Sequence, residues 1–447
     1  MNATLPLSRS SVGKVAVIGP NALLSQSDAG YYGPNNVCQG KFWTLVDAMS
    51  SGGKINATYD LGVPNVLSED QSGIADAVKM ASEVDTVVLA VGTDLTWGRE
   101  GHDATNISFT DAQTALIEKV SEAAKKPVVL VLFTANPLDI SAQLSNAKIG
   151  AILHVGQPSV TILGVEELMY GDVSPAGRTS CSRVYNRVPH FDMHFVCQNE
   201  HQHSSTNTRA PTLEHQHSNT GTIQTFYPAS YQDQISIFDF GMRPGTSTFA
   251  RPDCTNSDDP SQCPRGTNPG RTYRFYTGEP VVPFGYGLSY TSFSYAVVQT
   301  SSSQISLEPL DYLIRDAKSR GHHFVSSKLE SEHAELVGWK DSVQYAVNVT
   351  NTGSMDADDV VLGFMTPPGA GQNGVPLKTL FGFERVHVKA GETVQVFLYP
   401  DLTHFSQVDS DGIFRVHEGE YQIEFGLQET AEHGMGYVHA GTLKASL

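Results

Sequence analysis

The run "DTVVLAVG" at residues 85–92 decides the fold of the N-terminal part of the chain. Each residue from Val87 to Val91 is apolar, so both faces of the predicted strand must be covered. The same character recurs in "KVAVIGP" (14–20), "PVVLVLFTA" (127–135) and "IGAILHVG" (149–156). Strands that are apolar on both faces are typical of a parallel sheet with helices on each side.

Helical patterns separate these runs. Residues 72–84 and 161–171 predict two helices, and "TDAQTALIEKVSEAAKK" (110–126) predicts a third. Thr110 is its expected N-cap, and Gln113 stands three residues later, as in a capping box. The alternation of strands and helices predicts a mainly parallel α/β sheet with right-handed crossovers.

An acidic loop follows the first run. Residues 91–105 read "VGTDLTWGREGHDAT", so the strand ends at Gly92 and Glu100 follows between Arg99 and Gly101. Ligands of open α/β sheets bind beyond the carboxyl ends of the strands. We therefore expect Glu100 to lie at the edge of the sheet where chemistry takes place.

From about residue 342 the apolar period changes to two. Apolar residues alternate in "SVQYAVNVT" (342–350), "ETVQVFL" (392–398) and "GEYQIEFG" (419–426), and turn residues separate these segments. This pattern predicts an antiparallel β-sandwich. Residues 291–341 join the two parts and contain one expected strand, "SFSYAVV" (292–298).

Composition limits the partners. The chain has 447 residues, enough for two or three domains, and a net charge of −18, which argues against nucleic acid or an anionic membrane. No apolar stretch is long enough for a membrane span, and the N-terminus lacks a signal-peptide pattern. Four glycosylation sequons begin at Asn2, Asn56, Asn106 and Asn348.

Two features leave alternatives open. Cys254 and Cys263 bracket a polar loop that either closes as a disulfide or carries two free thiols. The tract 181–221 is polar, rich in His and Ser, and its composition predicts a disordered or loop insertion. Its His-Gln-His units at 201–203 and 215–217 are consistent with metal binding or, more simply, with a solvated tract.

Long motifs resemble glycoside hydrolase family 3, within it the β-xylosidase branch of plants and fungi. The matching segments run from "KVAVIGPNA" (14–22) to "PLKTLFGFERVHVKAGETVQVFL" (376–398), through "NPGRTYRFYTGEPVVPFGYGLSYTSF" (268–293). "PGRTYRFY" (269–276) leans toward xylosidases. The resemblance implies the family's C-terminal α/β sandwich domain at 9–290, a linker at 291–341 and a fibronectin type III-like domain at 342–430.

The resemblance also implies a site. Family members are similar to retaining glycosidases, which use one carboxylate as nucleophile and one carboxyl as acid/base. "GREGHD" (98–103) matches the family's acid/base context, so Glu100 is the expected acid/base. Arg99, His102 and Asp103 are expected to orient Glu100 or bind sugar hydroxyls, with ordinary surface residues as the alternative. Trp97 is expected either to stack on a sugar or to plug the loop onto the domain.

Two positions in the loop depart from the family pattern. Gly98 stands where xylosidase relatives often carry a second acid, and Ala104 stands where an arginine is usual. The family's nucleophile is an aspartate on a (β/α)8 barrel, and no barrel pattern precedes Lys14. The resemblance therefore implies that the barrel is missing or separately encoded, and that the isolated chain is inactive.

The resemblance leads to several hypotheses about function. The leading expectation is an exo-acting β-xylosidase that removes xylose from xylo-oligosaccharides without a cofactor or metal. A β-glucosidase or an α-L-arabinofuranosidase of the same family is the near alternative, and a non-catalytic carbohydrate-binding remnant is the distant one. The family implies an extracellular or cell-wall location, with neither nucleic acid nor membrane as partner.

Overall fold

The computed structural model describes residues 4–25, 42–50, 55–102, 104, 107–134, 138–157, 160–176, 231–236, 238–252, 254, 262–280, 283–322, 325, 329, 332–333, 343–408, 412–426 and 437–447. The expected tract 181–221 lies outside these residues. The chain divides into two compact units, residues 1–223 and 224–447.

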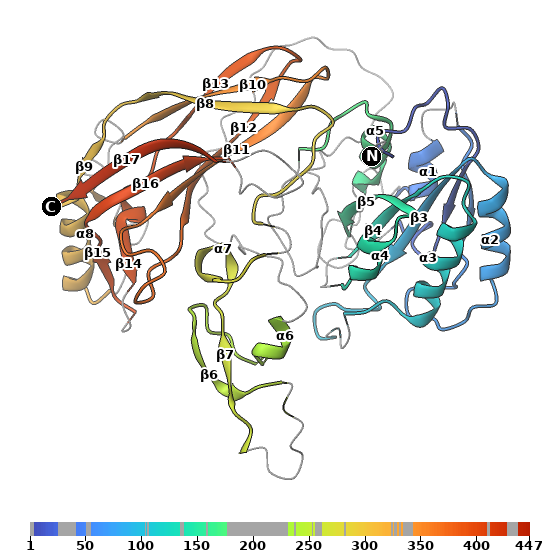
Figure 1. Ribbon diagram of the computed structural model, residues 1–447, viewed down its shortest axis with the longest axis horizontal. Coiled ribbons are helices and arrows are strands. Elements are labelled where there is room, and N and C mark those ends of the chain that lie inside the picture. Colours follow the sequence, from blue (N-terminus) through green and yellow to red (C-terminus); the bar gives the residue numbers. More distant parts are fainter. Residues whose placement is uncertain are drawn as a thin grey trace. The chain divides into compact units, whose positions relative to one another are not determined.

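The first unit is the expected parallel α/β sheet (Figure 1). Five parallel strands lie in the order β2-β1-β3-β4-β5. Helix α2 packs against α3, and α1 packs against α5 and the short 3₁₀ helix η2. The elements are β1 (Val15–Ile18), α1 (Leu45–Ser50), β2 (Thr58–Asp60), α2 (Ile74–Glu83), β3 (Thr86–Gly92), α3 (Asp111–Ala123), β4 (Val128–Phe133), α4 (Ser141–Ser145), β5 (Ile149–Gly156), η2 (Val160–Leu163) and α5 (Gly164–Tyr170).

The strand order sets the place of the acid loop. From β1 the chain moves outward to β2 and then returns past β1 to β3. The direction of travel therefore reverses between β1 and β3, which makes their carboxyl ends the topological switch point of the sheet. All seven residues of β3 are buried, so its carboxyl end is held firmly at that place.

The N-terminal segment fastens the last helix of this unit. Arg9 forms ion pairs with Glu166 on α5 and with Asp172 just beyond it, and its guanidinium lies 4.3 Å from the centroid of the Tyr170 ring. The Glu166 side chain is only 7% exposed. Burial raises the pKa of Tyr170 to about 12, so this neighbour stays neutral at ordinary pH. Arg9 is therefore the cation that compensates a buried carboxylate.

We expect Arg9→Met to destabilise the first unit by about 3 kcal/mol, because it leaves the Glu166 carboxylate buried without its cation. Urea unfolding measures the loss, and Glu166→Gln added to Arg9→Met restores part of it. The control is Lys125→Met, which breaks an exposed pair with Asp85 at 3.6 Å and costs below about 1 kcal/mol. Equal losses in Arg9→Met and Lys125→Met contradict this account.

The second unit contains an all-β sandwich. One sheet has the order β13-β10-β8 and the other β12-β11-β16-β17-β9. The alternating residues Val343, Tyr345, Val347 and Val349 are all buried in its core, as the period of two predicts. The elements are β8 (Phe293–Thr300), β9 (Gln304–Ser306), α8 (Glu308–Ser319), β10 (Tyr345–Asn351), β11 (Ala357–Thr366), β12 (Thr379–Val388), β13 (Thr393–Leu398), η5 (Leu402–Phe405), β14 (Ser406–Val408), β15 (Phe414–Val416), β16 (Gly419–Phe425) and β17 (Val438–Ser446).

The sandwich extends beyond the range expected for it. Strand β8 pairs with β10, and β9 pairs in parallel with β17, so both lie in the sandwich although 291–341 was expected as a linker. Strand β17 ends at Ser446, past the expected boundary at 430. The contacts also place residues 231–290 with this second unit.

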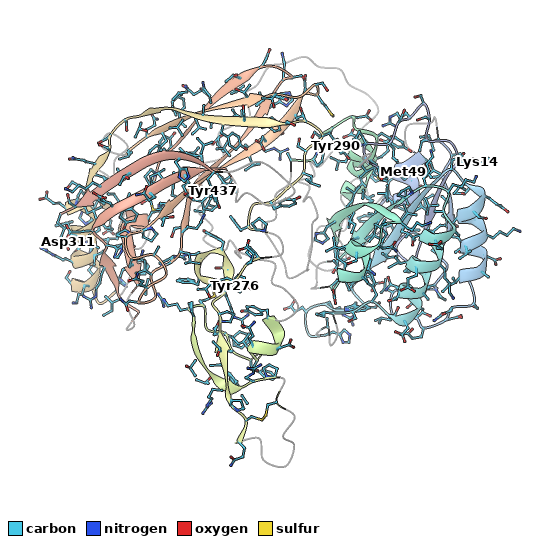
Figure 2. All side chains as sticks on the ribbon, in the orientation of Figure 1. Lys14, Met49, Tyr276, Tyr290, Asp311 and Tyr437 are labelled. Carbon is cyan, nitrogen blue, oxygen red and sulfur yellow. A yellow bond between two sulfur atoms is a disulfide. The ribbon has the colours of Figure 1, made fainter. Side chains whose placement is uncertain are left out.

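A small hairpin region precedes the sandwich. It comprises α6 (Tyr231–Gln234), the antiparallel strands β6 (Gly245–Ala250) and β7 (Arg265–Asn268), and α7 (Thr272–Phe275). Tyr276, labelled in Figure 2, packs with Tyr231 and Ile235, and the two tyrosine rings lie 5.8 Å apart. A disulfide joins Cys254 to Cys263. Of the two alternatives that the sequence left open, a bridge or two free thiols, the structure therefore has the bridge.

The hairpin region exposes two aromatic side chains and buries the acidic side chain between them. Phe238 and Phe240 are 64% and 80% exposed, whereas Asp239 between them is buried. The Asp239 carboxylate accepts a hydrogen bond of 2.8 Å from the backbone N–H of Gly241. A hydrogen bond from Ser247 holds the pKa of Asp239 below its usual value. The buried acid thus orders the loop that presents the two phenylalanines.

Candidate active-site loop

The root of the acid loop lies at the switch point. The carbonyl of Thr93, the first residue after β3, accepts hydrogen bonds of 3.1 Å from the side-chain amides of Asn21 and Gln157. Asn21 follows β1 and Gln157 follows β5. The Thr93 hydroxyl bonds to Thr134 Oγ1, beyond β4, at 3.1 Å. Groups from the ends of three other strands therefore fix the residue from which the loop starts.

The body of the loop is built by its own polar residues. The Asp94 carboxylate accepts from the backbone N–H of Thr96 at 2.8 Å, and the Asp94 carbonyl accepts from the backbone N–H of Trp97 at 3.0 Å. The guanidinium of Arg99 donates to the carbonyl of Leu95 at 2.8 Å. Asp94 and Arg99 therefore stabilise the conformation of the loop through hydrogen bonds to its own backbone.

The tip of the loop is a tight turn. Arg99 and His102 exchange two backbone hydrogen bonds, each of 2.9 Å, and form an isolated β-bridge. Glu100 and Gly101 are the two central residues, and Gly101 has a φ of +73°, a left-handed conformation that favours glycine. The Glu100 side chain is exposed. The carboxyl group therefore stands at the apex of a defined turn.

The structure distributes the expected site residues unevenly. Arg99, Glu100 and His102 come together in the exposed turn, whereas Trp97 is only 7% exposed. This burial favours the alternative in which Trp97 plugs the loop onto the domain. Asp103 and the sequon residues Asn2 and Asn106 lie outside the described residues.

Two buried polar residues at the sheet edge, His154 and Thr134, were missed by sequence reasoning. His154 lies near the end of β5, is buried, and its ring nitrogen Nε2 donates to the carbonyl of Thr134 at 2.9 Å. The signal in the sequence that could have identified them is a histidine and a threonine at the carboxyl ends of apolar runs.

Among the described residues, no group of three or more His, Cys, Asp or Glu side chains could hold a metal.

The motif "PGRTYRFY" has a packing role. Tyr273 stacks on Phe284 with ring centroids 4.5 Å apart, and its hydroxyl accepts a hydrogen bond of 2.9 Å from the backbone N–H of Leu380 on β12. Thr272 has a φ of +63°, which is rare for a β-branched residue. The motif thus attaches α7 to the sandwich.

The chain belongs to glycosyl hydrolase family 3. The model of the glycosyl hydrolase family 3 C-terminal domain matches residues 1–290, and that of the fibronectin type III-like domain matches residues 359–428. The parallel α/β sheet and the β-sandwich of this chain therefore correspond to these two domains.

Curated relatives share nearly all of the chain. It is 28% identical over 426 residues to a "probable exo-1,4-beta-xylosidase" of Aspergillus oryzae and 30% identical over 429 residues to a "probable beta-D-xylosidase 7" of Arabidopsis thaliana. Each match covers 95% of this chain but only 42% and 46% of the relative. The chain thus spans less than half the length of the relatives it matches.

Solved structures agree on the fold. A family 3 exo-beta-xylosidase in complex with a xylobiose aziridine activity-based probe matches with a TM-score of 0.66 and 23% identity, over 99% of this chain and 46% of that one. A beta-glucosidase from Listeria innocua matches with a TM-score of 0.60 and 18% identity, over 99% and 47%. None of the described helices is both long and apolar enough to cross a membrane.

Proposed function

We propose that this chain is the acid/base-bearing half of a retaining, exo-acting β-xylosidase that removes terminal xylose from xylo-oligosaccharides. One observation carries the proposal: Glu100 stands at the apex of a tight turn whose loop starts at the switch point of the parallel sheet. The xylosidase names of the relatives support the choice of sugar.

The proposed mechanism needs two carboxyl groups about 5–5.5 Å apart across the glycosidic bond. Glu100 protonates the leaving oxygen and then removes a proton from the attacking water. The nucleophile is an acid on the barrel that the family resemblance implies, in the part of the relatives that this chain does not match. Arg99 and His102 flank Glu100 and are proposed to orient it or to bind sugar hydroxyls, as is Asp103. Trp97 is proposed to hold the loop on the domain.

The names of other similar proteins support a second candidate function in the same family. One relative, from Medicago sativa subsp. varia, is a "beta-xylosidase/alpha-L-arabinofuranosidase 2" at 26% identity, and several similar structures are beta-glucosidases. Cleavage of arabinofuranosides or glucosides is therefore the alternative. A carbohydrate-binding role without catalysis is the remaining one.

We further propose an extracellular location. The Cys254–Cys263 disulfide is typical of oxidising compartments. Asn56, which begins a sequon, is exposed and is accessible to a glycan.

The test is an assay with nitrophenyl glycosides of xylose, glucose and arabinofuranose. We expect no turnover by the chain alone, because a double displacement needs both carboxyls. The completed enzyme is a hybrid in which the chain follows the part of the Aspergillus oryzae relative that it does not match. We expect this hybrid to cleave the xyloside fastest.

Each outcome of this assay distinguishes between the proposed functions. Turnover by the isolated chain contradicts the division of the two carboxyls between halves. A preference for another glycoside favours the alternative enzyme. A folded, monodisperse completed enzyme that cleaves none of the three glycosides favours the role in carbohydrate binding.

A further inference from the structure

We propose that Gln113 is a positioning residue for the acid loop, and that its side-chain amide couples helix α3 to the root of the loop that carries Glu100. This inference rests on the proposed function, because the loop matters for catalysis only if Glu100 is the acid/base. Gln113 lies in the first turn of α3, opposite the end of β3.

The amide of Gln113 engages both backbone groups of Gly92. Its Oε1 accepts from the Gly92 N–H at 3.1 Å, and its Nε2 donates to the Gly92 carbonyl at 3.1 Å and to the Val66 carbonyl at 2.8 Å. Gly92 is the last residue of β3 and precedes Thr93, where the loop begins. The side chain thus binds both backbone groups of the last residue of β3, as a neighbouring strand would.

Gln113 is itself fixed in place. The side chain is fully buried, and its backbone N–H donates to the Thr110 hydroxyl at 3.2 Å in the N-cap. The next backbone N–H upstream, that of Ala112, donates to the Glu69 carboxylate at 3.1 Å. Since the cap holds the first turn of α3, the amide of Gln113 has a defined direction toward Gly92.

The carboxamide of Gln113 matches what the backbone of Gly92 needs. Gly92 has a φ of +139°, a conformation that L side chains rarely adopt, so its peptide is turned away from regular strand geometry. Both buried backbone groups of such a residue need partners, and the carboxamide of Gln113 supplies one acceptor for the Gly92 N–H and two donors for the Gly92 and Val66 carbonyls. A buried polar group that loses its partner is costly, so the loop root depends on Gln113.

The loop carries its own reporter. Trp97 lies three residues before Glu100 and is 7% exposed, so its fluorescence reports whether the loop is seated. The chain has three tryptophans, and Trp43→Phe with Trp339→Phe leaves Trp97 alone. This readout needs no substrate and stays informative even if Glu100 proves not to be catalytic.

The experiment compares Gln113→Met with Gln143→Met in that background. Gln143 is a buried glutamine on α4 that makes no hydrogen bond to the loop in the described residues. We expect both variants to lower the melting temperature, but only Gln113→Met to shift Trp97 emission to longer wavelength. In Gln113→Met the backbone amides of residues 92–97 should also exchange about tenfold to a hundredfold faster.

Two results overturn the proposal. In the first, Gln113→Met changes neither the Trp97 emission nor the hydrogen exchange of the backbone amides of residues 92–97. Gln113 then contributes at most to stability and does not position the loop. The other is an equal change in Gln143→Met. Should Gln113→Met fail to fold, Gln113→Glu is judged by the same readouts. It keeps the acceptor for the Gly92 N–H but loses both donors.

Discussion

Gly92→Ala is expected to destabilise the first unit by about 4 kcal/mol or more. A Cβ at this position would lie 2.0 Å from the Phe133 carbonyl oxygen and 2.8 Å from its carbon. Both atoms are backbone of β4, a buried strand with a neighbour on each side, so neither can move without breaking the sheet. The φ of +139° adds conformational strain to this clash.

The control for Gly92→Ala is Gly156→Ala, at the end of β5. Gly156 also has a positive φ, +65°, but a Cβ there meets nothing within 4 Å. Its substitution is therefore expected to cost only about 1 kcal/mol, the price of a left-handed conformation. Urea unfolding followed by tryptophan fluorescence measures both. If the two variants lose the same stability, the close packing of β3 on β4 is not what holds the loop root.

The central strands were predictable because burial on both faces leaves a clear pattern. The apolar runs at 85–92 and 127–135 became β3 and β4, within two residues at each end. The elements at the edge of the sheet were not predictable, because they are too short to display a periodic pattern of apolar residues. Strand β2 has three residues and α1 has six, and β2 is mostly exposed.

Gln113 shows where local motifs stop being informative. Thr110 caps α3 as predicted, and the residue three positions later suggested a reciprocal capping box. The Gln113 side chain instead bonds to Gly92 and Val66, which are distant in sequence. Only the fold brings those backbone groups within reach, so the tertiary partners outweighed the local one.

The acid loop was placed correctly at the sheet edge by the rule for strand ends, but its internal bonds were not foreseeable. Arg99 was expected to orient Glu100 or bind sugar, and its guanidinium donates to the Leu95 carbonyl. The linker expectation for 291–341 missed β9 and α8, because β9 has three residues and pairs only with the distant strand β17. Such pairings depend on contacts far apart in the chain.

Glu100→Gln is expected to lower the turnover of xylobiose by the completed enzyme by about 10²- to 10⁴-fold. Glutamine has the shape of the acid but cannot give a proton to the leaving oxygen. The folding of the turn should not change, because its two backbone hydrogen bonds join Arg99 and His102. The control is Glu118→Gln, an exposed carboxyl on α3 far along the helix from the loop, which should leave turnover unchanged.

The measurement that tests the central claim most directly compares two substrates of the Glu100→Gln enzyme. Xylobiose needs a proton on its leaving group, whereas a dinitrophenyl xyloside does not, because dinitrophenolate departs unaided. If Glu100 is the acid/base, cleavage of xylobiose falls far more than formation of the glycosyl-enzyme from the dinitrophenyl xyloside. Equal losses on both substrates, or no loss on either, would contradict the assignment of Glu100.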